Sequence, residues 1–257
     1  MHAIRQGEGP DLLLIHGVGS SQRTWEHLIP PLARGRRVIA VDLPGHGASP
    51  AEDDSGTFAG LVRSLEAFLD GNGLAQVDMV GSSLGGRLVL ELARRGKAGA
   101  VVALDPGGFW IGWERTYLRT TLLASVGMLR TLGRLRSPLA HNALTRSLLL
   151  TQLSARPWEL DANRVTAELD SYAATRTFTA LVNDLAAIPM QEGPAAPGTG
   201  PIAIGWGRHD RLTWPVQAER ARAAFPSATL HWFEHSGHFP LWDQPEETLD
   251  LIRRTVG

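Results

Sequence analysis

A serine lies within a glycine-rich turn pattern that could present it as a nucleophile. The segment VDMVGSSLGGRLVLELARR passes from a strand-like apolar run through Gly81, Ser83 and Gly85 into a pattern typical of a helix. Such a Gly-x-Ser-x-Gly turn exposes the serine oxygen on strained backbone, and the glycines let strand and helix approach closely. The pattern predicts a nucleophile at Ser83, although an ordinary glycine-rich turn can carry the same letters.

Two further segments carry residues that could activate this serine. Asp210 follows the apolar run IAIGWG, and His238 lies in HSGHFPLWDQPEE near the C-terminal end. An imidazole between a hydroxyl and a carboxylate can take the serine proton while the carboxylate orients the ring. We therefore expect a catalytic triad of Ser83, Asp210 and His238. Asp105 also ends a strand-like run and is the alternative acid.

The elements that must position these residues alternate along the chain. Short apolar, partly β-branched runs predict strands at residues 12–16, 37–41, 77–81, 100–104, 201–205 and 229–233. Stretches with helical spacing lie between them, as in Phe58, Leu61, Val62 and Leu65. This alternation indicates an α/β fold with a mostly parallel central sheet flanked by helices, in which polar loops gather at the carboxyl ends of the strands.

The alternation stops at residues 108–190, where helix-like patterns continue without a convincing strand. We interpret 108–190 as an all-helical lid insertion, and residues 1–107 together with 191–257 as the core domain. The glycines and prolines of QEGPAAPGTG favour an exposed connector back to the sheet. The spacing of Leu118, Leu122 and Val126 predicts an amphipathic lid helix.

The lid segment is rich in aromatic residues. We predict that Trp110, Trp113 and Tyr117 line an apolar substrate pocket beside Ser83. Aromatic side chains also hold one layer of a protein against another, and packing of the lid on the core is the alternative explanation.

The same segment has an excess of basic residues. Between residues 111 and 150 the only acid is Glu114, and the arginines are Arg115, Arg119, Arg130, Arg134, Arg136 and Arg146. Such an excess is typical of a solvated basic face, and it could also attract an anionic or amphiphilic substrate or a lipid surface.

Composition excludes several classes of function. The 257 residues include 25 basic and 26 acidic side chains and no cysteine. A formal charge of −1 offers no field for a phosphate backbone, so we expect no nucleic acid partner. Cysteine-ligated metals are excluded, and no metal cluster or phosphate loop stands out, which predicts no metal and no cofactor. The N-terminal residues do not resemble a signal peptide and no apolar run reaches about 18 residues, so we expect a cytoplasmic protein without stable membrane insertion.

Four motifs together resemble the α/β-hydrolase superfamily, in particular its compact bacterial serine hydrolases with a helical lid. They read HGxG, DLPGHGxS, GxSxGG and SGH and are spread over nearly the whole chain. The order serine, aspartate, histidine is also that of the superfamily. Two features depart from its commonest pattern. Ser82 stands where histidine is frequent, and the chain starts almost at the first core strand, which suggests missing or shortened initial strands.

The resemblance implies a function and further site residues. It implies that the segment His16 to Gly19 forms the loop that supplies one oxyanion amide, and we assign the two donors to the backbone amides of Val18 and Leu84. The implied activity is that of a serine hydrolase cleaving an apolar or amphiphilic carboxylic ester, or a related acyl bond, through an acyl-enzyme on Ser83.

Two other functions stay open. Relatives with this turn and lid cleave carbon–carbon bonds of diketo acids, and the triad does not discriminate between the two chemistries. A ligand receptor that keeps the fold and binds a small apolar molecule is the third possibility. The natural substrate, its acyl-chain length and the oligomeric state do not follow from the sequence.

Overall fold

A single seven-stranded sheet forms the centre of the protein in a computed structural model that describes residues 1–257. The strands are β1 (Ala3–Gln6), β2 (Asp11–Ile15), β3 (Arg37–Val41), β4 (Val77–Ser82), β5 (Ala98–Leu104), β6 (Ile202–Gly207) and β7 (Thr229–Phe233). Their order is β1-β3-β2-β4-β5-β6-β7, and every neighbouring pair is parallel except β1 with β3. The predicted α/β class with a mostly parallel sheet is confirmed.

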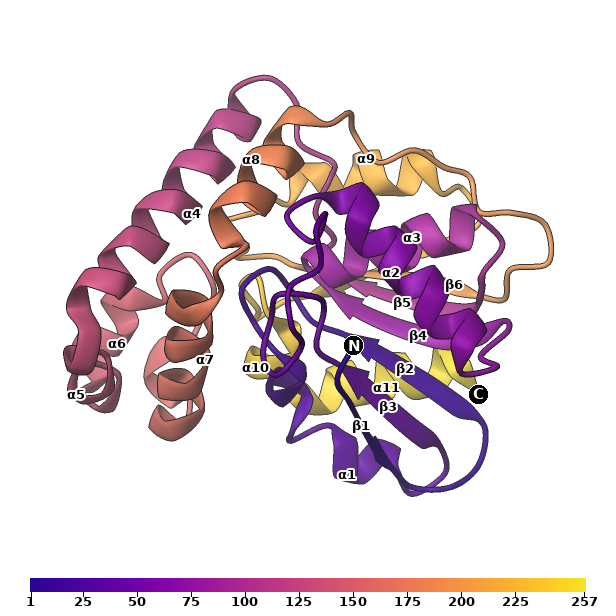
Figure 1. Cartoon of the computed structure of the whole chain (residues 1–257), viewed down its shortest axis with the longest axis horizontal. Coiled ribbons are helices and arrows are strands. Elements are labelled where there is room, and N and C mark those ends of the chain that lie inside the picture. The colour runs from indigo at the N-terminus through magenta and orange to yellow at the C-terminus, as the bar shows by residue number, and fades with distance from the viewer.

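Helices cover both faces of the sheet (Figure 1). The core helices are α1 (Ile29–Leu32), α2 (Phe58–Gly71), α3 (Leu84–Arg94), α9 (Val216–Ala224), α10 (Pro240–Asp243) and α11 (Pro245–Val256), with a 3-10 turn η1 (Gln22–Trp25). Side chains alternate along each strand, so in β2 Leu13 belongs to the apolar cluster with α2, α3 and α9, and Leu14 to the cluster with α1 and α11. Both faces are therefore buried, which explains the continuous apolar strands.

All six predicted strands are confirmed within one or two residues at their ends. The strand β1 was not predicted. It pairs antiparallel with β3, so that Ala3 lies opposite Val41 and Gln6 opposite Val38. The sequence offers little signal for it, because β1 is a four-residue edge strand with no buried residue. One short strand thus precedes the first core strand.

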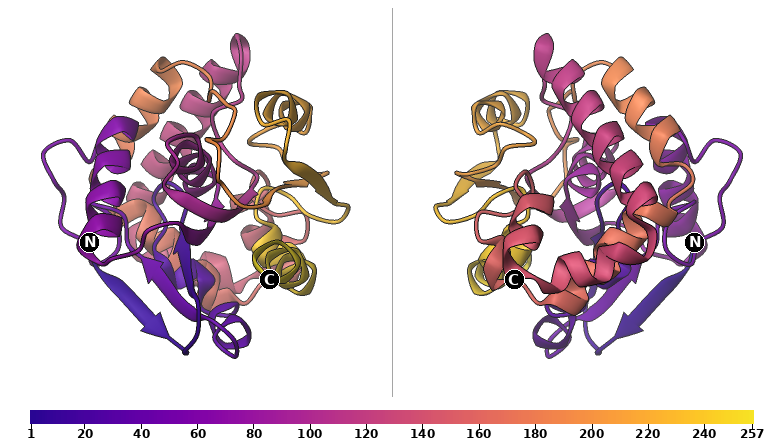
Figure 2. Two further views of the ribbon diagram at one scale, coloured as in Figure 1. Left: turned by 90° about the vertical axis from the view of Figure 1, so that its right-hand side faces the viewer. Right: turned by 90° about the vertical axis from the view of Figure 1, so that its left-hand side faces the viewer.

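The chain between β5 and β6 is helical, and we call residues 108–190 the helical insert. Its elements are α4 (Trp113–Leu132), η2 (Gly133–Leu135), α5 (Arg136–His141), α6 (Ala143–Leu149), η3 (Pro157–Glu159), α7 (Ala162–Ala174) and α8 (Phe178–Ala187). The arrowheads of the parallel strands point toward the insert in Figure 1, and Figure 2 (right) shows its helices in front of the core. The insert therefore lies at the carboxyl edge of the sheet, where ligands bind in open α/β folds.

Arginines stabilise the insert from within. Arg130 donates to the carbonyls of Ala173 and Thr175 at the end of α7, and Arg115 donates to the carbonyl of Ile188 after α8. Carbonyls at the end of a helix lack partners inside the helix, so these guanidinium groups satisfy them. Five of the six arginines noted in the sequence make hydrogen bonds to other parts of the chain: Arg115, Arg119, Arg130, Arg136 and Arg146. This bonding accounts for much of the basic excess.

No helix in the structure has both the length and the apolar character that crossing a membrane requires.

Candidate active site

The turn between β4 and α3 holds Ser83 in a strained backbone conformation. Ser83 has φ 57° and ψ −114°, in the region that favours glycine. A Cβ at Gly81 would lie 2.1 Å from the Gly85 carbonyl oxygen, and a Cβ at Gly85 would lie 2.1 Å from the carbonyl oxygen of Ile15. Both glycines are therefore required by the close contact of strand, turn and helix, as the Gly-x-Ser-x-Gly pattern predicts.

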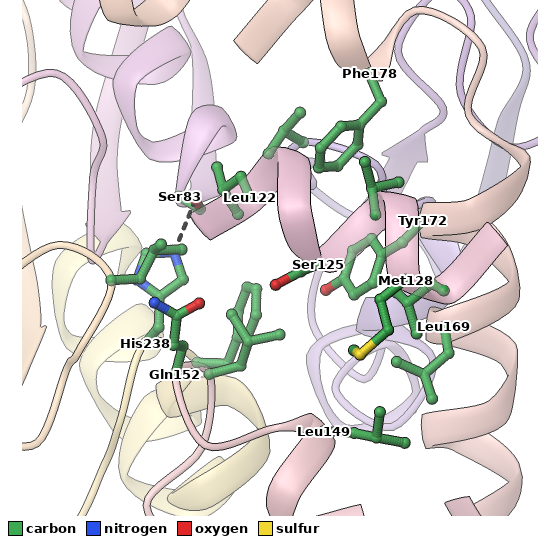
Figure 3. Close-up of a pocket in the computed structure, with 16 residues that line it drawn as sticks. Ser83, Leu122, Ser125, Met128, Leu149, Gln152, Leu169, Tyr172, Phe178 and His238 are labelled. Carbon is green, nitrogen blue, oxygen red and sulfur yellow. Dashed lines mark hydrogen bonds between the residues drawn. The ribbon is translucent and has the colours of Figure 1, made fainter. Parts of the chain in front are cut away.

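His238 lies between the serine and a carboxyl group. Its Nε2 is 2.8 Å from Ser83 Oγ, and its Nδ1 is 2.8 Å from Asp210 Oδ2. The histidine and the aspartate are buried, and Ser83 is 8% exposed at the end of a pocket (Figure 3). The three predicted triad residues, which come from the loops after β4, β6 and β7, are brought together. In this arrangement the ring can accept the serine proton at Nε2 while Nδ1 donates to the aspartate.

The side chain of Asp210 is fixed by its own loop. Its Oδ1 accepts hydrogen bonds from the amides of Leu212 and Thr213 at 2.7 and 3.0 Å, and the Thr213 hydroxyl donates to Oδ2 at 2.6 Å. The same hydroxyl lies 3.2 Å from Nδ1 of His238. Sequence reasoning did not identify Thr213, and its position three residues after the aspartate is the one available signal. It helps to hold Asp210 in the orientation that meets the ring.

Two backbone amides beside the serine have no acceptor within the chain. They are those of Val18 and Leu84, the first in the loop after β2 and the second at the N-terminus of α3. The loop touches the serine, because a Cβ at Gly17 would lie 3.2 Å from Ser83 Cβ. Free amides in this position can bind an oxyanion, with the partial positive charge at the start of α3 acting in the same direction.

An elongated apolar pocket runs from Ser83 along the inner side of the insert. Ser83 and His238 lie at one end in Figure 3, and Met128, Leu149 and Leu169 lie farthest from them. The lining residues are Val18, Ser83, Leu122, Ser125, Val126, Met128, Leu129, Leu149, Gln152, Leu153, Leu169, Tyr172, Phe178, Leu212, His238 and Phe239. No lysine or arginine is among them, so the pocket suits an uncharged, apolar group.

The family model for the alpha/beta hydrolase family matches residues 12–251 of the chain. The chain belongs to this family. An uncharacterised protein of Mycobacterium tuberculosis is 31% identical to the chain over 264 residues, with 96% of this chain and 75% of that protein covered. A 2-hydroxy-6-oxononadienedioate/2-hydroxy-6-oxononatrienedioate hydrolase of Paraburkholderia xenovorans is 28% identical, with 96% and 87% covered.

Solved structures agree with the fold of this alpha/beta hydrolase. A thermophilic esterase from Thermogutta terrifontis superposes with a TM-score of 0.78 at 18% identity, covering 98% of this chain and 91% of the esterase. An enol-lactonase from Burkholderia xenovorans gives a TM-score of 0.77 at 21% identity, covering 99% and 95%. At such identities the likeness supports the architecture and leaves the reaction open.

A second buried acid lies beside the hydrolase's Asp210. Carboxylate oxygens of Asp105 and Asp210 and a ring nitrogen of His238 all lie within 4.8 Å of one another. The amide of Gly207 donates to Asp105 Oδ1, and Oδ2 has no partner. Burial and then the charge of Asp210 raise the pKa of Asp105 well above its usual value. Three such groups could bind a cation together. The atoms of Asp210 and His238 that would bind it already make hydrogen bonds, which favours an acid–imidazole pair.

The other histidines near these loops serve the backbone or lie at the surface. Nδ1 of His16 donates to the Gly17 carbonyl at 2.7 Å, and its Nε2 accepts from the Leu43 amide at 3.0 Å. Burial lowers the pKa of His16, so the ring is neutral and shapes its loop. His209 and His235, the neighbours of the acid and base segments, are exposed.

Three aromatic residues predicted to line the pocket lie outside it. Trp110 is buried in the core with Arg87 of α3 over its ring, Trp113 is 65% exposed, and the Tyr117 hydroxyl donates to the Arg211 carbonyl. Helical spacing does not reveal which face of a helix turns toward a cavity. Two other aromatic residues of the insert, Tyr172 and Phe178, do line the pocket.

Proposed function

We propose that this alpha/beta hydrolase cleaves carboxylic esters with an apolar acyl group through an acyl-enzyme on Ser83. The supporting observation is the hydrogen-bonded chain from Ser83 through His238 to Asp210 at one end of an apolar pocket. With an apolar acyl group in the pocket, the hydroxyl, the base and the orienting acid would lie beside its carbonyl end. The site contains the parts of a nucleophilic mechanism in mutual contact.

In the proposed mechanism, the Ser83 oxygen attacks the ester carbonyl while its proton passes to Nε2 of His238. The amides of Val18 and Leu84 stabilise the negative charge that develops on the carbonyl oxygen. His238 then gives the proton to the departing alcohol, and water, activated by the same ring, releases the acyl group. Asp210 orients the ring and stabilises its charged form.

The pocket supports an apolar acyl chain as the group held beside the serine. The lining residues on α4 are apolar except Ser125. Polar groups are few: Figure 3 shows Ser125, Gln152 and Tyr172 among the labelled lining residues. Each methylene that leaves water for such a pocket contributes about 0.8 kcal/mol. The helical insert, which supplies most of this lining, acts in this proposal as the lid predicted from the sequence.

The carbon–carbon bond hydrolase alternative is disfavoured by the same pocket. The names of the Paraburkholderia xenovorans and related hydrolases specify dioates, substrates with two carboxylates. A carboxylate buried without a cationic partner costs several kcal/mol, and no cationic side chain of lysine or arginine lines the pocket. A ligand receptor needs no hydrogen-bonded acid, base and nucleophile, so this third possibility leaves the triad geometry unexplained.

Labelling with an alkyl fluorophosphonate tests the proposal directly. The probe should attach to Ser83, and Ser83→Ala should abolish both labelling and turnover of p-nitrophenyl esters. Ser82→Ala is a matched control, because Ser82 is an adjacent buried serine whose oxygen has no partner.

Substrate panels separate the three functions. Steady turnover of acyl esters that increases with chain length supports the esterase, with little cleavage of a vinylogous diketo acid. Faster cleavage of the diketo acid would assign the site to carbon–carbon bond hydrolysis. Labelling of Ser83 without turnover of either substrate would favour the receptor.

A further inference from the structure

One face of helix α7 contacts the loop that carries the Val18 amide, which we call the His-Gly loop (residues 16–20). Glu168, Ser171, Tyr172 and Thr175 recur at the spacing of a single helix face. This face belongs to the helical insert, far from the loop in sequence, as the separations of 148 to 156 residues show. The insert therefore fixes a part of the core that lies next to Ser83.

The contacts are hydrogen bonds and close packing. Ser20 Oγ donates to the carboxylate of Glu168, with distances of 2.9 and 3.1 Å to its two oxygens. The hydroxyl of Ser171 donates to the carbonyl of Gly19 at 2.8 Å, and that of Thr175 lies 3.2 Å from the same carbonyl and 2.9 Å from the carbonyl of Ser171. A Cβ at Gly19 would come within 2.8 Å of the Tyr172 ring, so only glycine fits against α7 there.

Glu168 is the single carboxylate of this contact and is 4% exposed. Burial raises its pKa to about 7, and hydrogen bonds from Thr24 and Ser20 and the charges of Arg23 and Arg164 oppose the shift. No arginine or lysine pairs with the carboxylate. A buried carboxylate without a counter-ion relies on its hydroxyl donors, so the Ser20 bond stabilises the ionised form of the acid.

We propose that Glu168 is a positioning residue for the oxyanion site: by holding Ser20, it fixes the His-Gly loop so that the Val18 amide faces the place beside Ser83 where the carbonyl oxygen of the substrate would lie. The inference rests on the proposed function, since it needs Val18 as an oxyanion donor. Two peptide units separate the Val18 amide from Ser20, so a shift of Ser20 moves the donor. Glu168 acts through the loop and does not touch the substrate.

Substitutions on both sides of the bond test this role. Ser20→Ala and Glu168→Ala each remove it, and we expect kcat to fall about 10- to 100-fold, less than the loss from deleting a donor outright. KM should change by less than about threefold, because the pocket is unaltered. Glu168→Gln keeps an oxygen that accepts from Ser20 and should retain most of the activity. Asn163→Ala, at an exposed position of the same helix, is the control.

A transition-state analogue distinguishes positioning from general damage. The inhibition constant of an alkyl trifluoromethyl ketone, which forms an oxyanion on the serine, should rise in Ser20→Ala by the same factor as kcat falls. Binding of the carboxamide with the same alkyl chain, which forms no oxyanion, should stay unchanged. The double variant Ser20→Ala/Glu168→Ala should lose no more than Glu168→Ala alone, because the bond that Ser20→Ala removes is already absent there.

Each outcome supports or overturns the proposal. Unchanged kcat in a folded Ser20→Ala enzyme, or a loss expressed in KM with the ketone bound as tightly as before, would overturn the role of Glu168. If Glu168→Ala does not fold, Ser20→Ala, which deletes one oxygen atom, decides the question by itself. If the proposed function is wrong, the wild-type protein itself shows no ester turnover that depends on Ser83, so this outcome is distinct from a loss in the Ser20 or Glu168 variants.

Discussion

Two buried aspartates compete for the role of the acid, and exchanging each for asparagine separates them. Asp210 Oδ2 accepts from His238 Nδ1 at 2.8 Å and from the Thr213 hydroxyl at 2.6 Å. In Asp210→Asn, an amide NH2 placed at this position cannot accept from the ring. With the oxygen there instead, the NH2 would face the amides of Leu212 and Thr213, which also donate. Either orientation breaks hydrogen bonds, and the first favours the wrong ring tautomer.

The expected loss follows from that tautomer. The same exchange in a serine protease triad lowers turnover about 10,000-fold, so we expect kcat of Asp210→Asn to fall about 1,000- to 10,000-fold. This corresponds to about 4 to 5 kcal/mol of transition-state stabilisation.

Asp105→Asn should instead retain activity within about threefold. Burial and the neighbouring charge of Asp210 raise the pKa of Asp105 well above its usual value, which favours the neutral form of its side chain. Asparagine is neutral too, and its oxygen can keep the 2.9 Å hydrogen bond from the Gly207 amide. Its NH2 group takes the place of Asp105 Oδ2, which has no hydrogen-bond partner.

Ester turnover at saturating substrate measures both variants, with the enzyme concentration taken from absorbance and the fold checked by circular dichroism. Near-normal turnover in Asp210→Asn together with a collapse in Asp105→Asn would transfer the acid role to Asp105. Near-normal turnover in both would refute the view that the chain of hydrogen bonds drives the reaction.

Two further predictions concern the pocket and α7. Each added methylene of the acyl chain should raise kcat/KM about fourfold in the wild type. Met128→Trp should block the far end of the pocket and abolish this increase for long acyl esters only. Ala124→Trp, at an exposed position of the same helix, should leave this gain unchanged. Equal dependence of kcat/KM on chain length in the two variants would contradict the assigned pocket. Burial raises the pKa of Glu168 from 4.5 to about 7, so the folded state binds the proton more tightly and the free energy of unfolding falls as pH rises through this window. In urea unfolding, the free energy of unfolding of Glu168→Gln relative to wild type should rise by about 3 kcal/mol between about pH 5 and pH 8. A difference between the two proteins that does not change with pH would contradict the raised pKa.

The strands of the core could be predicted because burial on both faces makes each an uninterrupted apolar run. The exception has a physical reason: Ala3–Gln6 has little apolar content, and its hydrogen bonds come from an antiparallel neighbour far along the chain, at residues 38–41. Ser83, Asp210 and His238 were recognisable because each follows a strand within a distinctive turn, and all such turns meet at one edge of a parallel sheet.

The pocket lining was harder to predict, since it depends on how the helices of the insert are rotated. Trp113 and Tyr117 share α4 with Leu122 and Val126, yet the aromatic pair packs with Trp214 outside the pocket. The arginine excess was equally ambiguous in sequence, because hydrogen bonds to distant helix ends leave no local pattern. Glu168 has the same property, because its partner Ser20 is set by tertiary contacts alone.

Helix α7 contacts both the pocket and the His-Gly loop. Leu169 and Tyr172 line the pocket, while Glu168 and Ser171 on the same helix bind the His-Gly loop. A larger acyl group that pushes on the first pair therefore also moves the second, because a helix transmits displacement as a nearly rigid rod. Chain-length preference in this hydrolase should consequently appear in kcat as well as in KM. An insert that only covered the site would affect substrate binding alone. The division of the chain-length preference between kcat and KM therefore measures how strongly the pocket and the His-Gly loop are coupled.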